Sequence, residues 1–192
     1  TTAAMTEKIA AAARRVAAPG TEIVAVNPDK GPVSIEGFYD EAMSVPGVLE
    51  LIRRHEGYDA AVIACFDDTG LDAARCATDR PVVGIGEAAY HMAAMLSNKF
   101  SVVTTLARSV PALEHNLQKY EDRAEAIVLG CAGMTDLADH LAAAHGVPVL
   151  DGVVCAVGLC EAMARLGLRT TRRGGYAPPR DKSGKGAGRK VA

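Results

Sequence analysis

Two stretches of the chain decide its fold: Ala60-Ala-Val-Ile-Ala-Cys-Phe-Asp-Asp-Thr-Gly70 and Ala126-Ile-Val-Leu-Gly-Cys-Ala-Gly-Met-Thr135. Each is an unbroken apolar run that ends near a cysteine, Cys65 or Cys131, and continues into small or capping residues. Apolar strands without polar alternation are typical of parallel sheets covered on both faces, and the residues that follow favour a helix start. Each stretch therefore predicts a strand-to-helix junction with a thiol at the carboxyl end of the strand, where parallel sheets bind ligands.

The rest of the chain alternates short Val/Ile runs with helical segments. Expected strands cover 22–26, 60–64, 82–85, 100–104, 126–129 and 147–150. Expected helices cover 5–16, 48–55, 71–76, 87–96, a segment capped by Ser109, 134–144 and 153–166. This strict alternation predicts an α/β fold with mainly parallel sheets flanked by helices.

Composition places the chain among globular proteins. Of the 192 residues, 49% are hydrophobic and 23% charged, which excludes wholesale disorder. No apolar run approaches the ~18 residues of a membrane span, and no secretion signal opens the chain. We therefore expect a cytoplasmic protein with no membrane partner.

The basic C-terminal tail raises the question of nucleic-acid binding. From Arg169 onward, eight basic residues accompany one acidic residue, and such tails can bind nucleic acid. Residues 182–190, however, contain no aromatic side chain that could stack on bases. We expect a solvated end and no nucleic-acid partner.

The five cysteines form no metal motif. An odd number without a signal peptide indicates free thiols in a reducing compartment. No Cys-x-x-Cys pair is present and no His lies near a cysteine, so we expect no metal.

The two strand-end thiols are candidate catalytic groups. A thiol at a helix N-terminus faces free amides and a positive dipole end, which predicts a pKa below the ~8.5 of a free thiol. The alternative is that each cysteine is a small buried hydrophobe. Asp67 and Asp68 are acid–base candidates, but capping of the helix at Leu71 explains them equally well.

Other polar residues have two interpretations. Thr104 and Thr105 end an expected strand at the same edge, where they either bind substrate or cap. Ser34 is either a ligand contact or a turn residue. Gly84-Ile-Gly86 lacks the third glycine of a dinucleotide site, so we interpret it as a tight strand-to-helix connection.

These segments resemble the Asp/Glu racemase superfamily and, within it, the hydantoin and allantoin racemases. The segments that carry the resemblance are Gly31-Pro-Val-Ser-Ile-Glu-Gly37, Ala64-Cys-Phe-Asp-Asp-Thr-Gly70, Val103-Thr-Thr105 and Leu129-Gly-Cys-Ala-Gly-Met134. The resemblance extends from about Thr1 to Pro179. It implies two similar α/β lobes with the active site in the cleft between them, a homo-oligomer, and racemisation of a small molecule without cofactor by one cysteine from each lobe, Cys65 and Cys131.

The resemblance also implies a domain organisation with two departures from the family. Lobe one is expected at 1–90, without the family's first strand, and lobe two at 91–150, without a segment near 120–121. Residues 151–170 are expected to form a helix that returns to lobe one, and 171–192 a basic flexible tail.

The chemistry implied is proton transfer at C5 of a 5-substituted hydantoin or allantoin. The C5 proton is acidic because the enolate spreads onto the adjacent carbonyl, and inversion needs a base on one face and an acid on the other. Backbone amides are expected to hold the enolate oxygen. These amides belong to Phe66, Asp67, Ala132 and Gly133.

Three alternatives remain open. An amino-acid racemase of the Asp/Glu type or an arylmalonate decarboxylase-like enzyme would share the superfamily. A two-lobed ligand-binding protein without enzymatic activity would leave the paired thiols unexplained.

Overall fold

The computed structural model describes residues 2–97, 100–107, 110–117, 126–131, 134, 137–146 and 148–179. Its helices are α1 (Ala3–Val16), α2 (Phe38–Arg54), α3 (Leu71–Ala77), α4 (Ile85–Leu96), α5 (Val110–Leu117), α6 (Ala138–His145), α7 (Gly152–Arg165) and the 3-10 turn η3 (Gly174–Tyr176). Its strands are β1 (Ala61–Ile63), β2 (Val82–Gly84), β3 (Phe100–Val103), β4 (Ala126–Leu129) and β5 (Val149–Asp151).

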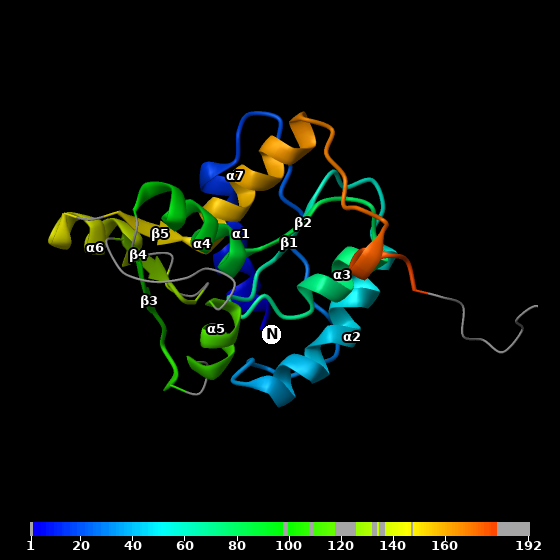
Figure 1. The fold of residues 1–192 in the computed structure, drawn as a ribbon, viewed down its shortest axis with the longest axis horizontal. Coiled ribbons are helices and arrows are strands. Elements are labelled where there is room, and N and C mark those ends of the chain that lie inside the picture. The colour runs from blue at the N-terminus through cyan, green and yellow to red at the C-terminus, as the bar shows by residue number, and fades with distance from the viewer. Residues whose placement is uncertain are drawn as a thin grey trace, which may run out of the picture.

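The strands form two parallel sheets, as the alternation predicted. β1 pairs with β2, with Ile63 opposite Gly84. β4 lies between β3 and β5 in the second sheet, so that Leu129 is opposite Val103 on one side and Asp151 on the other. Figure 1 shows the two sheets side by side with helices around them. The α/β fold with parallel sheets flanked by helices is confirmed.

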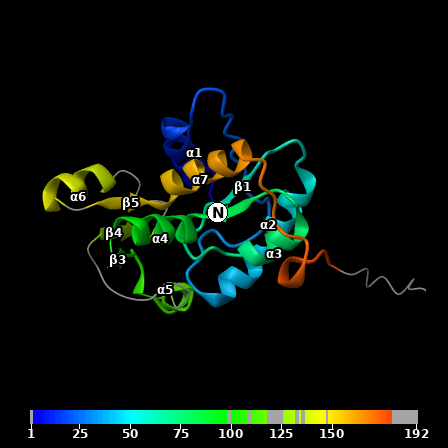
Figure 2. The ribbon, with the colours of Figure 1, turned by 45° about the horizontal axis from the view of Figure 1, so that its top comes forward.

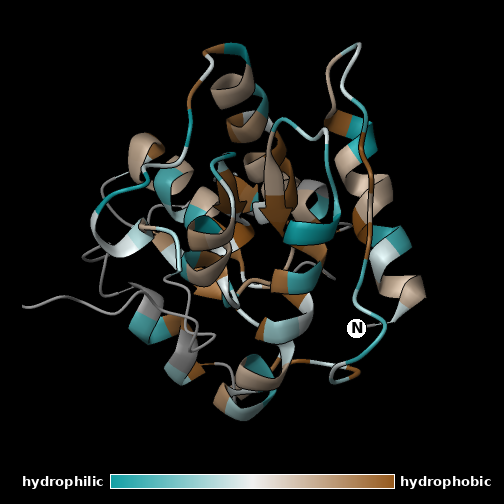
Figure 3. Cartoon of the chain, turned by 90° about the vertical axis from the view of Figure 1, so that its right-hand side faces the viewer, coloured by the Kyte–Doolittle hydropathy of each residue, from teal (hydrophilic) through white to brown (hydrophobic). Residues whose placement is uncertain are grey.

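Helices α4 and α7 join the two sheets. They pack against each other, and both contact β2 of the first sheet and β5 of the second. Tyr90, Ile85 and Val153, which lie on these helices, are at most 2% exposed. Figure 3 shows the hydrophobic strands at the centre, with helices of mixed polarity outside. The core therefore lies where α4 and α7 meet the strands and holds the sheets together by apolar burial.

The expected strand at 22–26 is wrong, because the structure gives this segment no strand pairing. Val24 is 66% and Val26 46% exposed, and only Ile23 packs against the core. A β-branched run becomes a strand only where a neighbouring edge and a buried face are available. Ile23 alone gives this segment little buried surface, and none of the described strands pairs with it.

The expected start of the second helix at Val48 is also wrong, since α2 begins at Phe38 and continues through Pro46. Proline lacks the N–H for the helical hydrogen bond, which normally ends or kinks a helix. The first turns are held instead by Asp40, whose carboxylate accepts from the Glu36 amide at 3.0 Å and whose carbonyl accepts from the Ser44 hydroxyl at 2.8 Å.

The segment after α7 runs back along α3. The Thr170 hydroxyl donates to the Arg80 carbonyl at 2.7 Å, and Arg172 donates to the carbonyls of Arg75 and Thr78. The Tyr176 hydroxyl donates to the Asp72 carboxylate at 2.9 Å. Figure 2 shows this segment beside α3. Among the helices that the structure describes, none is long and apolar enough to cross a membrane.

Candidate active site

Cys65 lies in the loop between β1 and α3, two residues after the last residue of the strand. A tight turn follows it, in which the Asp68 amide donates to the Cys65 carbonyl at 3.0 Å. The half-buried Cys65 Sγ contacts the Thr69 hydroxyl at 3.4 Å. Helix α3 begins at Leu71 after Gly70, whose φ of 75° lies in the left-handed region that favours glycine. The thiol is thus held within its own loop, ahead of the helix.

Burial raises the pKa of the Cys65 thiol to about 11. The Thr69 hydroxyl and the backbone amides of Asp67 and Thr69 lower this pKa, while the Asp67 carboxylate raises it. The expectation of a lowered pKa is therefore wrong for Cys65. Removing the thiolate from water outweighs the donors that face it.

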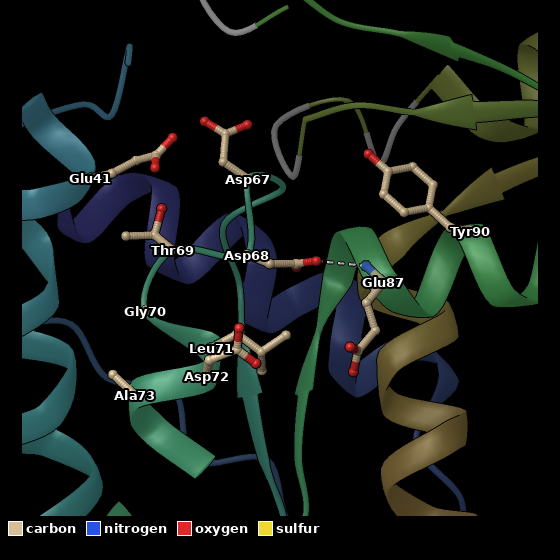
Figure 4. A pocket seen from close by; sticks show the side chains of 10 residues that line it. All are labelled: Glu41, Asp67, Asp68, Thr69, Gly70, Leu71, Asp72, Ala73, Glu87 and Tyr90. Carbon is tan, nitrogen blue, oxygen red and sulfur yellow. Dashed lines mark hydrogen bonds between the residues drawn. The ribbon is translucent and has the colours of Figure 1, made fainter. Parts of the chain in front are cut away.

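A cavity of about 210 Å³ lies beside this loop. Its lining residues come from the loop and from α2, α3 and α4, and Figure 4 shows them together. They are Glu41, Asp67, Asp68, Thr69, Gly70, Leu71, Asp72, Ala73, Glu87 and Tyr90. Half of them carry carboxylates, and no cationic side chain is among the described lining residues. The cavity is therefore acidic.

Glu41 is the functional candidate that the sequence analysis missed. Its Oε1 is buried and has no hydrogen-bond partner among the described residues. Burial raises the pKa of Glu41, the nearby Asp67 carboxylate raises it further, and His115 on α5 lowers it. Figures 1 and 2 show α5 beside the N-terminal part of α2, so α5 from the second half of the chain approaches the cavity. The sequence analysis missed Glu41 because the expected helix began at Val48, after Pro46, and left Glu41 outside any expected element.

The Asp68 carboxylate binds the first turn of α4 and not that of α3. It accepts the amides of Gly86 at 2.9 Å and Glu87 at 2.8 Å, the latter drawn in Figure 4. Both carboxylate oxygens are used in these bonds, and the Leu71 amide at the start of α3 donates to the Asp68 backbone carbonyl instead, at 3.0 Å. Capping of the helix at Leu71 by the Asp68 side chain is therefore wrong. Burial raises the pKa of Asp68 to about 7, although both amides lower it.

The glycines of Gly84-Ile-Gly86 make room for this contact. A Cβ on Gly84 would lie 2.1 Å from Asp68 Oδ1, and one on Gly86 would lie 2.4 Å from the Phe66 carbonyl oxygen and 2.9 Å from Asp68 Oδ2. α4 starts at Ile85, directly after β2. The segment is a tight strand-to-helix connection, as expected, and a carboxylate of the protein itself occupies the start of the helix.

Cys131 follows β4 and is half-buried. The residue before it is fixed to β3, because the Gly130 amide donates to the Val103 carbonyl at 2.7 Å and the Thr104 hydroxyl donates to the Gly130 carbonyl at 3.3 Å. The Met134 amide donates to the Cys131 carbonyl at 3.0 Å. Ala132 and Gly133, the expected amide donors, lie outside the described residues.

The structure distributes the other expected site residues unevenly. Asp67 lines the cavity, and burial raises its pKa. The Phe66 side chain is 4% exposed and meets the Tyr90 ring edge-on at 5.5 Å between centroids. The Ser34 hydroxyl donates to Glu36 on an exposed loop, and Thr105 is exposed. The described residues that line the cavity include neither of the two thiols, Cys65 and Cys131, nor Ser34, Thr104 or Thr105.

The three other thiols make structural contacts. Cys76 Sγ donates to the Gly175 carbonyl at 3.1 Å, at the segment that follows α7. Burial raises the pKa of Cys155 to about 11 and that of Cys160 to about 12. In the part of the chain that the structure describes, no three His, Cys, Asp or Glu side chains are grouped so as to hold a metal ion.

Comparison with known proteins agrees with this architecture. A family model described as Asp/Glu/Hydantoin racemase matches residues 1–122 and 119–160. The hydantoin racemase of Rhizobium meliloti is 44% identical, over 99% of this chain and 95% of that protein. The hydantoin racemase of Pseudomonas sp. (strain NS671) is 42% identical, over 97% of this chain and 92% of that protein.

A solved structure shares both fold and sequence. The allantoin racemase from Klebsiella pneumoniae superposes with a TM-score of 0.90 at 44% identity, over 97% of this chain and 93% of that one. The extent of these matches confirms the resemblance seen in the sequence: the chain belongs to the Asp/Glu/hydantoin racemase family.

Proposed function

We propose that this protein racemises 5-substituted hydantoins or allantoin without a cofactor, by proton transfer between C5 and two thiols, Cys65 and Cys131. The observation that carries the proposal is the matched pair of junctions: each cysteine follows the carboxyl end of a parallel strand, one in each sheet. Relatives with 42–44% identity are named hydantoin racemases, and a structural neighbour is named an allantoin racemase.

The two thiols take complementary roles in each inversion. One thiolate removes the C5 proton from one face, the electron pair spreads onto the neighbouring carbonyl, and the other thiol returns a proton to the opposite face. For the other enantiomer the roles are exchanged. With a pKa raised to about 11, Cys65 rests in the protonated form at neutral pH. It is therefore ready to act as the acid, and the thiolate that remains after it has given up this proton is the base for the other enantiomer.

The acidic cavity supports a substrate that presents N–H groups. The ring nitrogens of a hydantoin and the ureido group of allantoin donate hydrogen bonds, which carboxylates such as Glu41 and Asp67 accept. Carboxylates would also attract the ammonium group of an amino acid, but aspartate and glutamate carry two carboxylates, and no cationic side chain among the described lining residues could pair with them. Arg75, close to the cavity, already forms an ion pair with Glu87. The cavity thus favours the hydantoin class over aspartate or glutamate.

We also propose the two-lobe organisation expected from the sequence, with boundaries near residues 90 and 150 and α7 returning to lobe one. Its support is the contact of α7 with α1, β1 and β2. We propose as well that lobe two lacks a segment of the family near 120–121. In support, the alignment with the Pseudomonas relative spans 228 positions, which is more than the 192 residues of this chain. The family-model matches also meet at 119–122. The homo-oligomeric state and cytoplasmic location stay predictions.

The test is exchange of the C5 proton in D₂O, followed by proton NMR on each pure enantiomer of benzylhydantoin and of allantoin. We expect Cys65→Ser and Cys131→Ser each to abolish inversion, because serine is a far weaker base. Each variant should still exchange the C5 proton of one enantiomer, or hand, for deuterium through its remaining thiol. The two variants should act on opposite enantiomers. Cys76→Ser, a thiol that faces the C-terminal segment, is the matched control and should keep both activities.

Two results would contradict the proposal. Full racemisation in either active-site variant would remove that thiol from the reaction. Exchange of the same hand in both variants would show that the thiols do not act on opposite faces.

A further inference from the structure

Asp68 occupies a backbone conformation that its side chain alone does not favour. Its φ is 51°, and it is the one non-glycine residue with positive φ in the part of the chain that the structure describes. An L-residue in the left-handed region is strained, and such strain persists where surrounding contacts over-determine it. Asp and Asn tolerate this region best. The contacts that hold Asp68 there therefore indicate what the residue does.

Those contacts join two elements that are neighbours in the sheet. Asp68 lies after β1, while the amides that its carboxylate accepts, from Gly86 and Glu87, lie after β2. β1 and β2 are paired up to Ile63 and Gly84. The carboxylate thus fastens the loop that carries Cys65 to the start of α4, a helix whose residues Ile85, Ala88 and Ala89 are fully buried.

The residue that bears this carboxylate lies, along the chain, between two residues whose groups face the thiol. The backbone amides of Asp67 and Thr69 both lower the pKa of Cys65, as does the Thr69 hydroxyl, 3.4 Å from Sγ. Asp67 and Thr69 are the two chain neighbours of Asp68. Fixing Asp68 therefore fixes the direction of both amides and of the Thr69 side chain relative to the sulfur.

We propose that Asp68 is the positioning residue for Cys65: by binding the amides of Gly86 and Glu87 it holds the Cys65 loop in the geometry for proton transfer. This inference rests on the proposed function and adds a residue with a defined role to it. Both carboxylate oxygens of Asp68 are used in binding these amides, and Asp68 lies in the loop of Cys65, not in that of Cys131. Its influence is consequently confined to the half of the reaction that Cys65 performs.

This confinement gives a readout that general destabilisation would not produce. Let the Cys65 hand be the enantiomer that Cys131→Ser still exchanges in D₂O. In an otherwise unaltered protein, Asp68→Asn keeps the residue type suited to φ 51° and one acceptor oxygen, but turns an N–H₂ toward an amide that needs an acceptor. We expect it to slow exchange of the Cys65 hand on the order of tenfold to a hundredfold relative to the other hand.

Two further variants make the experiment decisive. Asp68→Gly suits the backbone but removes both acceptor oxygens, and it should shift the ratio between the hands further in the same direction. Asp151→Asn is the matched control: Asp151 is buried and also accepts two amides, those of Val153 and Val154, at the start of α7. This control should destabilise the fold without changing the ratio between the hands.

The outcomes separate this inference from the proposed function. If Cys65→Ser and Cys131→Ser prefer opposite hands and Asp68→Asn slows both hands equally, the positioning role of Asp68 is overturned and the two-thiol reaction stands. If the two cysteine variants prefer the same hand, the proposed function is overturned and the role of Asp68 with it. A selective loss on the Cys65 hand supports both.

Discussion

The contact between Asp68 and Gly84 predicts a large and removable effect of adding one methyl group. In Gly84→Ala, the new Cβ would lie 2.1 Å from Asp68 Oδ1, and the three nearest atoms all belong to the Asp68 carboxyl group. The φ of −84° and ψ of 146° at Gly84 suit alanine. The expected destabilisation therefore comes from displacing the carboxylate and involves no backbone strain.

The magnitude follows from the bonds that the carboxylate loses. Each hydrogen bond to a charged group contributes about 1.5–3 kcal/mol, and two such bonds, to Gly86 and Glu87, are broken. Release of a carboxyl group whose pKa burial has raised to about 7 offsets part of this loss. We expect Gly84→Ala to lower the free energy of unfolding by about 2–3 kcal/mol.

A double-mutant cycle isolates this effect. In an Asp68→Gly background the three nearest atoms are absent, so Gly84→Ala should change stability by less than about 0.5 kcal/mol, leaving a coupling energy of about 2 kcal/mol. Gly86→Ala is the matched control: its new Cβ meets the Phe66 backbone carbonyl first, at 2.4 Å. Its destabilisation should therefore persist in the Asp68→Gly background.

Urea unfolding followed by far-UV circular dichroism measures all the variants, since the chain contains no Trp for fluorescence. Equal losses from Gly84→Ala in the two backgrounds would refute the reasoning. Such a result would mean that Asp68 does not occupy the space beside Gly84 in solution.

Three further predictions concern the thiol, a helix cap and metal dependence. Because burial raises the pKa of Cys65 to about 11, its alkylation by iodoacetamide, measured by mass spectrometry, should rise about tenfold per pH unit between pH 8 and 10; a plateau below pH 9 would contradict this. Asp151→Ala removes the acceptor of two amides at the start of α7 and should lower the free energy of unfolding by about 1–2 kcal/mol. An unchanged free energy of unfolding in urea would contradict this role as a helix cap. Racemisation, followed by optical rotation, should survive dialysis against EDTA; loss with recovery on adding a divalent ion would contradict the two-thiol reaction.

The elements that the sequence predicted are those whose signal is local. Unbroken apolar runs of four or five residues placed β1, β2 and β4, and Gly146 ended α6 in the left-handed conformation expected of a helix C-terminus. These signals depend on burial and dihedral preferences that neighbouring residues share. The two cysteine-containing junctions belong to this class, which is why the α/β fold followed from local patterns, whereas the family was indicated by a resemblance.

The elements that the sequence missed depend on the rest of the molecule. Residues 22–26 have the composition of a strand, but Val24 and Val26 are exposed and the segment pairs with no described strand. Because proline normally ends a helix, Pro46 excluded the first turns of α2 from the expected helix, and Glu41 lies on these turns. Sheet pairing and the tolerance of a proline are decided by tertiary packing.

The pKa of Cys65 shows the same limit for chemistry. Its neighbours in sequence, small and capping residues before a helix, predicted a lowered pKa, and the amides of Asp67 and Thr69 do act in that direction. The desolvation that outweighs them comes from packing around the loop, which no local pattern encodes. The strength of a buried acid is a property of the whole fold.

The contact of Asp68 with the start of α4 depends on the pairing of β1 with β2. Asp67 and Asp68 are adjacent and chemically identical in sequence, and both line the cavity, yet only the Asp68 carboxylate accepts the amides of Gly86 and Glu87. What separates them is the left-handed φ of Asp68 and the missing Cβ atoms at Gly84 and Gly86. Pairing of β1 with β2 brings these three features together. Two short motifs that look unrelated in the sequence, an Asp pair and a Gly-x-Gly, are therefore the two halves of one contact.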